Sequence, residues 1–336
     1  MPAEWSAHQG TFMSWPKRHN VWINESSPDG LIKAKLAYAS VANAISEFEP
    51  VYMVTDAAFE SEVKKLCSSN VKTLVMPHDD SWVRDNGPTF VVSRDKQIAG
   101  IKWQFNAWGE KYTPYDQDNL VASRILEHFK IQEFKPDIIL EGGAIHVDGN
   151  GTLLTTAECV LNSNRNKNFT KEEFEKTVHD YLGVNKVIWL PYGLYGDETD
   201  GHIDNVACFT EIGKVVMQGT QDKSDPNYER TTDNLQILQN SHDASGKKLE
   251  VTVIKQPPTR FHNNERLTLS YINYYLVNGG LILPVFGHDA KKYDENAIDI
   301  LKELFPNRKI VAIDGTEIIK GGGNIHCITQ QMPQII

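Results

Sequence analysis

Apolar and polar positions follow two patterns that alternate from one end of the chain to the other. Segments with apolar residues on one helical face predict helices at 33–48, 57–67, 118–129, 170–182, 227–239 and 294–304. Short apolar runs predict strands at 11–15, 51–55, 71–76, 89–92, 138–140, 144–147, 187–190, 203–209, 249–254 and 310–313. This alternation of helices and strands indicates an α/β protein.

The helix predicted at 170–182 has the most clearly marked ends. Thr170 and Glu173 have the spacing of a capping box, in which each side chain accepts a hydrogen bond from the other residue's backbone N–H. Gly183 follows the last apolar position and can take the left-handed conformation that ends a helix. Local chemistry therefore predicts both boundaries of this helix.

A larger unit recurs roughly every 50 to 80 residues. It consists of a helix, a strand, a polar or glycine-rich loop and a short apolar strand. The loop and second strand are DNGPTF (85–90), EGGAI (141–145), GHID (201–204), GGLI (279–282) and GGGNI (321–325). Such repetition predicts a radial or barrel-like fold rather than a doubly wound sheet, with a (β/α)-barrel as the alternative. Because no low-complexity linker interrupts the pattern, we predict one domain over residues 1–336.

Ionisable residues that interrupt apolar surroundings cluster at the starts of these second strands. They are Asp85, Glu141, His202, Asp204 and Cys327. If the units converge on one axis, these side chains share one pocket. Buried carboxylates cost several kcal/mol unless they are paired, so a pocket with three acids calls for a cation.

Taken singly, each of these residues has a simpler interpretation. Cys327 lies in an apolar run after three glycines, and a free Cys in such a run is more often a core side chain than a nucleophile. Asp85 can pair with the arginine before it, and Glu141 can be a surface acid before a glycine turn. His202 and Asp204 have the spacing of two metal ligands on one side of a strand. Their recurrence at the same place in each unit favours a common site.

A pocket with three acids, one histidine and one cysteine suits the hydrolysis of a guanidinium group. Carboxylates hold this planar cation by charge-assisted bidentate hydrogen bonds. A thiolate can attack the guanidinium carbon, and a histidine can protonate the departing ammonia. The same histidine can then activate water, so that the covalent amidino-cysteine intermediate gives a ureido product.

Composition narrows the classes of partner and compartment. The net charge of −10 disfavours nucleic acid and mildly favours a cationic ligand. No apolar run approaches the roughly 20 residues of a membrane span, and the N-terminus lacks a signal-peptide pattern. The cysteines are scattered without a CxxC pair, which disfavours a thiolate zinc site and fits a reducing cytoplasm: Cys67, Cys159, Cys208 and Cys327.

Several stretches resemble the agmatine deiminases, and the resemblance spans nearly the whole chain. The matching stretches are MPAEW (1–5), FMSWP (12–16), WVRDNGP (82–88), EGG (141–143), NSNRN (162–166), GDETDGHID (196–204) and GGGNIHCITQQ (321–331). The last two are the most specific. The resemblance implies the pentein fold, a five-bladed α/β propeller with pseudo-fivefold symmetry. It also implies hydrolysis of agmatine to N-carbamoylputrescine and ammonia, a step of putrescine and polyamine biosynthesis, without a metal or cofactor.

The resemblance also implies a role for individual residues, carried over position by position. Cys327 matches the nucleophile, His202 the general acid and base, and Glu141 the carboxylate that orients this histidine. The remaining matches bind the substrate: Asp85 and Asp204 clamp the guanidinium, Trp82 lies along the aliphatic stem, and Glu198 lies near the distal ammonium. The resemblance suggests a homodimer, although no stretch of the sequence indicates an interface.

Other functions remain open at this point. A deiminase of peptidyl or free arginine and an amidinotransferase would use the same thiol and histidine. A metal hydrolase would instead use His202, Asp204, Glu141 and Cys327 as ligands. A catalytically inactive binding protein of the same fold is disfavoured by the intact set of reactive residues.

Overall fold

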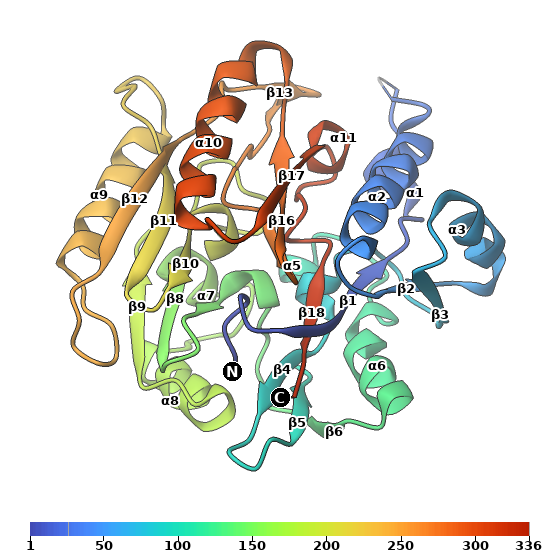
Figure 1. Cartoon of the computed structure of the whole chain (residues 1–336), viewed down its shortest axis with the longest axis horizontal. Coiled ribbons are helices and arrows are strands. Elements are labelled where there is room, and N and C mark those ends of the chain that lie inside the picture. The colour runs from blue at the N-terminus through green and yellow to red at the C-terminus, as the bar shows by residue number, and fades with distance from the viewer. Residues whose placement is uncertain (26, 336) are drawn as a thin grey trace.

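Five small sheets follow one another around a common centre in the computed structural model, which describes residues 1–25 and 27–335 (Figure 1). In each sheet an inner strand pairs antiparallel with a second strand, which pairs parallel with a third. A helix connects the second strand to the third on the outside of the ring. The predicted fold class, the α/β pentein propeller, is confirmed.

The five units are listed here from inner to outer strand, with the connecting helix last. The first is β18 (Gln330–Pro333), β1 (His8–Ser14), β2 (Val51–Thr55), the additional β3 (Val71–Val75), and α2 (Gly30–Ser46). The second is β4 (Thr89–Val92), β5 (Ile98–Ile101), β6 (Gln132–Phe134) and α6 (Val121–Phe129). The third is β7 (His146–Val147), β8 (Thr152–Thr156), β9 (Lys186–Leu190) and α8 (Lys171–Leu182). The fourth is β10 (Ala207–Glu211), β11 (Lys214–Gly219), β12 (Glu250–Lys255) and α9 (Asn227–Asn240), and the fifth is β15 (Tyr275–Val277), β16 (Gly280–Val285), β17 (Lys309–Asp314) and α10 (Lys291–Leu304).

Short elements connect these units. The helices are α1 (His19–Trp22), α3 (Glu60–Leu66), α4 (Val83–Asn86), α5 (Ala107–Glu110), α7 (Ala157–Val160) and α11 (Thr316–Ile319). The 3₁₀ turns are η1 (Ala57–Phe59), η2 (Asp118–Leu120), η3 (Gly142–Ala144), η4 (Ile203–Asn205) and η5 (His288–Ala290). A separate hairpin is formed by β13 (Phe261–His262) and β14 (Glu265–Arg266). None of the helices in the described ranges is both long and apolar enough to cross a membrane.

The ends of the chain meet in one sheet. Inner strand β18 pairs with β1 in antiparallel register, with Gln330 opposite Phe12 and Met332 opposite Gly10. The backbone N–H of Gln334 also donates to the carbonyl of Ala7 at 2.7 Å. The first unit therefore takes its inner strand from the C-terminal end of the chain, and this pairing completes the ring.

Helix α8 shows how the sequence determines an element. Its buried positions, Phe174, Val178 and Leu182, are spaced four apart and so form one apolar stripe. The predicted capping box between Thr170 and Glu173 is present, and Gly183 ends the helix with φ of +70°. Both predicted ends of this helix are confirmed.

Several predicted strands are wrong in kind or extent. Residues 138–140 make only an isolated bridge, between Gln104 and Ile139, and residues 203–205 form a 3₁₀ turn before β10. The segment at 325–328 that holds the cysteine is a turn before β18 rather than a strand. Gly279 and Gly280 lie at the β15–β16 hairpin and not before an inner strand. Hydrophobic periodicity cannot distinguish a buried turn from a short buried strand, which explains these errors.

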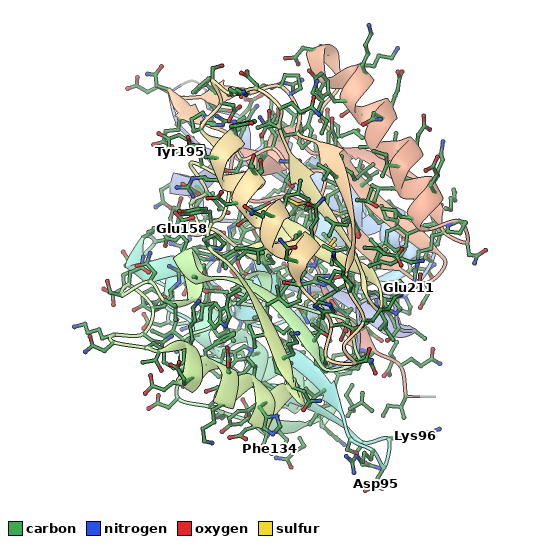
Figure 2. The ribbon with its side chains drawn as sticks, turned by 90° about the vertical axis from the view of Figure 1, so that its left-hand side faces the viewer. Asp95, Lys96, Phe134, Glu158, Tyr195 and Glu211 are labelled. Atoms are coloured by element: carbon green, nitrogen blue, oxygen red, sulfur yellow. The ribbon has the colours of Figure 1, made fainter. Side chains whose placement is uncertain are left out.

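The segments that enter the inner strands all lie at one end of the ring. Seen from the side, the turns of the β4–β5 and β10–β11 hairpins, marked by Asp95, Lys96 and Glu211, lie on one face of the molecule (Figure 2). Tyr195 and Glu158 lie on the opposite face. The entering segments are α4, η3, η4, residues 270–274 and residues 324–329, and the contacts of η3 with α4 and η4 join three of them directly. One end of the ring thus carries the candidate site. The single domain over residues 1–336 stays a prediction.

Candidate active site

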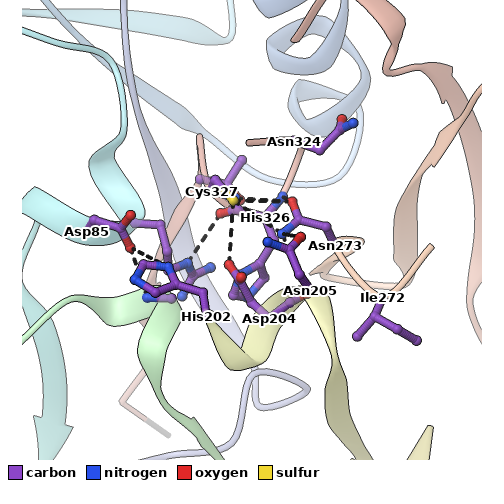
Figure 3. A network of polar contacts seen from close by, with 12 residues as sticks. Asp85, His202, Asp204, Asn205, Ile272, Asn273, Asn324, His326 and Cys327 are labelled. Atoms are coloured by element: carbon purple, nitrogen blue, oxygen red, sulfur yellow. Dashed lines mark hydrogen bonds and ion pairs between the residues drawn. The ribbon is translucent and has the colours of Figure 1, made fainter. Parts of the chain in front are cut away.

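The entering segments bring the five predicted ionisable residues into one buried cluster. Asp85 comes from α4, Glu141 precedes η3, His202 and Asp204 flank the start of η4, and Cys327 lies in the turn before β18. All five are at most 4% exposed. Figure 3 shows Asp85, His202, Asp204 and Cys327 around a common space. The repeat therefore places these residues as the sequence predicted, although their roles remain to be tested.

His202 lies between two carboxylates. Its Nδ1 is 3.8 Å from Asp85 Oδ1 and its Nε2 is 3.7 Å from Glu141 Oε2, and neither nitrogen has a hydrogen-bond partner among the described residues. Burial lowers the pKa of His202, but Asp85, the Cys159 thiol and Glu141 together raise this pKa well above its usual value. The imidazolium form is therefore favoured, and it carries a proton that it can donate.

The Cys327 thiol lies among acids and one amide. Its Sγ is 3.6 Å from Asp204 Oδ2 and accepts a hydrogen bond from Asn273 Nδ2 at 3.2 Å (Figure 3). Burial raises the pKa of Cys327 well above its usual value, and the charges of Asp204 and Asp85 raise it further. These surroundings therefore favour the thiol form of Cys327, and a cation between the two aspartates would favour its ionisation.

Sequence reasoning missed Asn273. This residue lies just before inner strand β15, the position in the fifth unit that corresponds to Asp85, Glu141, His202 and Cys327 in the others. The glycine pair at 279–280 was taken for that position instead. The available signal was a single polar residue inside the apolar run YINYYLV at 271–277.

The two aspartates have opposite electrostatic environments. Burial raises the pKa of Asp85 to about 6, helped by Asp204 and Glu141, although Trp108 Nε1 donates to its Oδ2 at 2.9 Å. Burial also acts on Asp204, but a hydrogen bond from His326 Nδ1 at 2.8 Å keeps the pKa of Asp204 below its usual value. The Oδ1 atom of Asp204 has no hydrogen-bond partner among the described residues. One carboxylate oxygen in the buried cluster is thus left without a partner among the described residues.

Arg165 holds Glu141 from behind. Its Nε donates to Glu141 Oε1 at 2.7 Å, and its other nitrogens donate to Asp200 Oδ2 at 2.6 Å and to the carbonyl of Thr199 at 2.9 Å. Burial raises the pKa of Glu141, but Arg165 and His202 together outweigh burial, and the pKa lies below its usual value. The stretch NSNRN at 162–166 therefore provides the cation that keeps Glu141 ionised.

Among the described residues, one group has ligand atoms close enough together for a metal ion. It consists of Glu141, Cys159 and His202, whose ligand atoms lie within 4.8 Å of one another. The guanidinium of Arg165 already occupies one oxygen of Glu141, which places a positive charge beside any cation there. The four residues of the metal-hydrolase alternative do not form such a group within the described ranges. The expected absence of a metal and of a cofactor stays a prediction.

Comparison with known proteins agrees with the geometry of the candidate site. The family model described as Porphyromonas-type peptidyl-arginine deiminase matches residues 1–333. The chain belongs to this family. It is 46% identical over 335 residues to a putative agmatine deiminase of Legionella pneumophila, covering 99% of this chain and 94% of that one. It is 44% identical to an agmatine deiminase of Pseudomonas aeruginosa, covering 99% and 95%.

A solved structure supports the fold of this family for the whole chain. The agmatine deiminase of Enterococcus faecalis superimposes with a TM-score of 0.94 at 36% identity, covering 100% of this chain and 96% of that one. The five sheets and the entering segments described above are therefore the arrangement of a known enzyme family. The predicted family membership is confirmed.

The opening of the candidate site is narrow. Trp82, Glu198, Tyr112 and the three glycines at 321–323 line a small cavity with Asp85 and Cys327. Trp82 stacks on Trp22 with ring centroids 5.9 Å apart, and the hydroxyl of Tyr112 donates to Glu198 Oε1 at 3.0 Å. Both residues that the resemblance assigned to the stem and the distal ammonium thus line the cavity, with Glu198 farther out toward the open depression beside it.

Gly322 provides a test of the glycine turn. Its φ is +99°, and a Cβ atom there would lie 2.1 Å from Glu198 Oε2. We expect Gly322→Ala to lower kcat/KM for a guanidine substrate about 10- to 100-fold because Glu198 must move. The unfolding free energy should fall by only about 1–3 kcal/mol. Steady-state kinetics and chemical denaturation measure the two effects.

Gly246→Ala is the matched control for this variant. Gly246 also has positive φ, +86°, but no atom lies within 4 Å of the added Cβ. It should lose similar stability and keep its activity. Equal activity in the two variants would show that the glycine at 322 serves only the backbone turn.

Proposed function

We propose that the protein hydrolyses agmatine to N-carbamoylputrescine and ammonia, a step toward putrescine and the polyamines. The observation that carries this proposal is the buried cluster that joins the Cys327 thiol, the His202 imidazole and two carboxylates with different environments. Relatives of high identity are named agmatine deiminases over nearly their whole length, which supports the same reaction.

The first half of the reaction uses the charges around the thiol. The guanidinium binds between Asp85 and Asp204 and neutralises the acids that keep Cys327 protonated. Cys327 then loses its proton to solvent, and the thiolate attacks the guanidinium carbon. The His202 imidazolium donates its proton to the departing nitrogen, which leaves as ammonia. The product of this half is a cationic amidino group on Sγ, with His202 neutral.

The second half reverses the role of the histidine. Neutral His202 takes a proton from water, and the resulting hydroxide adds to the amidino carbon. Collapse of this adduct expels the Cys327 thiolate and leaves a protonated ureido group, which gives up its proton. Glu141, held by Arg165, keeps the imidazolium stabilised and in place during both halves.

The residues at the opening of the cavity favour agmatine over arginine as the substrate. Glu198 lies at the outer end of the cavity, where an ammonium would pair with it and the carboxylate of free arginine would be repelled. Burial raises the pKa of Glu198, so pairing with an ammonium would restore its charge. The narrow mouth between Tyr112 and the glycines at 321–323 also disfavours a peptide chain.

Release of ammonia from agmatine, arginine and a peptidyl arginine tests the proposal. We expect turnover of agmatine well above that of the other two, and unchanged activity after exhaustive chelation. Preference for a peptidyl arginine would make the protein a peptidyl-arginine deiminase, and amidino transfer to an added amine would make it an amidinotransferase. Loss of activity on chelation would favour the metal hydrolase.

The pH dependence provides a further prediction. Because the pKa of Asp85 is raised to about 6, kcat/KM for agmatine should fall as pH decreases through that value. Trp108→Phe removes the N–H donor that lowers this pKa, so the acid limb should move to higher pH. Trp103→Phe, which removes an indole N–H that donates to Thr89, should leave the limb in place. If the acid limb of kcat/KM is unchanged in both variants, Asp85 is not part of the guanidinium clamp.

Assembly and compartment are also proposals. We infer a homodimer in a cytoplasmic setting, on the family resemblance and on scattered cysteines that are free in the structure. Sedimentation of the purified protein tests the dimer, and fractionation of the source cells tests the compartment.

A further inference from the structure

A buried histidine links the candidate clamp to the N-terminal segment. His326 Nδ1 is 2.8 Å from Asp204 Oδ2, and His326 Nε2 is 2.8 Å from Glu4 Oε2. Each of the three side chains is at most 5% exposed. Glu4 and His326 are 322 positions apart in the sequence, and nothing in the catalytic proposal above uses either of them.

Glu4 and the backbone of His326 each make further hydrogen bonds. Glu4 Oε1 accepts a hydrogen bond from the backbone N–H of Leu276 at 2.9 Å. The backbone N–H of His326 donates to Asn273 Oδ1 at 3.0 Å, and Arg84 Nε donates to the carbonyl of His326 at 3.3 Å. These contacts hold one carboxylate and the backbone that carries the ring in place.

A histidine between two carboxylates satisfies both only when both ring nitrogens carry a proton. The groups that face it are Glu4, Asp204, the Arg84 guanidinium 3.8 Å from Glu4, the His146 ring and the Tyr275 ring. Burial and Arg84 lower the pKa of His326, but Glu4 and Asp204 outweigh them and raise it. For His146, burial outweighs the charges of Glu4 and Asp204 and lowers the pKa to about 4, so this ring stays neutral.

The two clamp carboxylates differ because only one of them meets this imidazolium. Asp204 accepts a hydrogen bond from His326 on Oδ2, and its Oδ1 has no partner among the described residues. Asp85 accepts neutral N–H donors, from Trp108 and the backbone of Gly143, and its Oδ1 lies 3.8 Å from the His202 imidazolium, beyond hydrogen-bond distance. Opposite environments of this kind separate the ionisation of two neighbouring acids. Asp204 therefore stays charged as pH decreases, whereas Asp85 takes up a proton near pH 6.

We propose that Glu4 and His326 are positioning residues that hold Asp204 ionised, with its free oxygen directed at the substrate guanidinium. This role rests on the proposed function. Asp204 becomes the anchor that stays charged at low pH, and Asp85 completes the clamp in its ionised form. Sequence far from the catalytic motifs, in the segment MPAEW at 1–5, thereby contributes to recognition of the guanidinium.

The first arm of the test is ¹⁵N NMR of histidine-labelled protein, which needs no activity. We expect the His326 signals, assigned by their loss in His326→Gln, to show an imidazolium at pH 7. In Glu4→Gln the loss of one carboxylate should lower the pKa of His326, so that these signals titrate at lower pH. Neutral-imidazole signals at pH 7 would overturn the proposal.

The second arm is steady-state kinetics with agmatine. His326→Gln should raise KM at least about tenfold, as expected when a buried charge-assisted hydrogen bond is lost. Its effect on kcat should be smaller, and the acid limb of kcat/KM should move to higher pH because Asp204 loses its cation. Glu4→Gln should move KM in the same direction by less, and it serves if His326→Gln fails to fold.

His146→Gln is the matched control for loss of a buried histidine ring, and it should keep the wild-type KM and acid limb. A wild-type KM and acid limb in His326→Gln and Glu4→Gln would overturn the proposal, as would equal changes in all three variants. If wild-type protein releases no ammonia from agmatine, the proposed function fails. The NMR arm still decides separately whether the imidazolium exists.

Discussion

Replacing Cys327 with serine should abolish turnover of agmatine while the protein stays folded. Loss of a catalytic nucleophile typically lowers kcat by about 10⁴- to 10⁶-fold, and we expect a loss in this range. Serine nearly preserves the volume of the 3%-exposed side chain and can still accept the hydrogen bond from Asn273. The melting temperature should therefore change little. Ammonia release and thermal unfolding measure the two quantities.

Chemical labelling gives this prediction a control. A haloacetamidine carries the amidine group that the clamp recognises, so it should alkylate Cys327 rapidly and agmatine should protect the thiol. Cys67 is half-buried, and burial raises the pKa of its thiol to about 11. Cys67→Ser should therefore keep full activity and the same labelling. Full activity in Cys327→Ser, or protected labelling at another cysteine, would contradict the covalent mechanism.

Replacing Arg165 with methionine should destabilise the protein by about 3–5 kcal/mol, the usual effect of removing one partner of a buried ion pair. The side chains of Arg165 and Glu141 are each 1% exposed, so Glu141 would be left as an uncompensated buried charge. Urea denaturation measures the loss. Activity should fall as well, because this guanidinium holds Glu141 and also the Thr199 carbonyl and the Asp200 carboxylate in the segment before His202.

The pH dependence of this loss identifies its cause. In the wild type the lowered pKa of Glu141 gives stability that is present above the unfolded-state pKa of about 4.3 and is lost as pH falls through the folded-state value. In Arg165→Met only His202 opposes burial, so the folded-state pKa of Glu141 rises and less stability is gained above the unfolded-state value. The difference between the two proteins should therefore be larger at pH 7.5 than at pH 4.5.

Arg230→Met is the matched control for Arg165→Met. Arg230 pairs with Glu158 at 2.7 Å, but these side chains are 25% and 32% exposed. Its loss should cost at most about 1 kcal/mol. A pH-independent difference for Arg165→Met, or equal losses in the two variants, would show that packing rather than charge accounts for the effect.

Local signals in the sequence predicted the regular elements well. The strands at 51–55 and 89–92 have their predicted bounds, and the capping box and terminal glycine of α8 are both present. These features depend on neighbouring residues, which the sequence displays directly. The predicted strand at 203–209 was wrong at its start because a buried turn and a buried strand share the same apolar composition.

The candidate site was predictable where the repeat marked it and not elsewhere. Asp85, Glu141, His202 and Cys327 each precede an inner strand, so their equivalence could be read from spacing. The residues that support them come from other elements, and no local pattern joins the partners. Arg165 reaches Glu141 across 24 positions, and Glu4 reaches His326 across 322. Such pairs follow from how the units close on one another in space.

The pairing of β18 with β1 also sets when the site can exist during synthesis. Cys327, the proposed nucleophile, lies three positions before the strand that fills the last gap in the ring, and Arg84 is held by Gln331 of that same strand. A nascent chain that has emerged as far as α10 already carries Asp85, Glu141, Asp204 and His202, but it has neither the Cys327 thiol nor a closed first sheet. The complete site can therefore form only after β18 has left the ribosome and paired with β1.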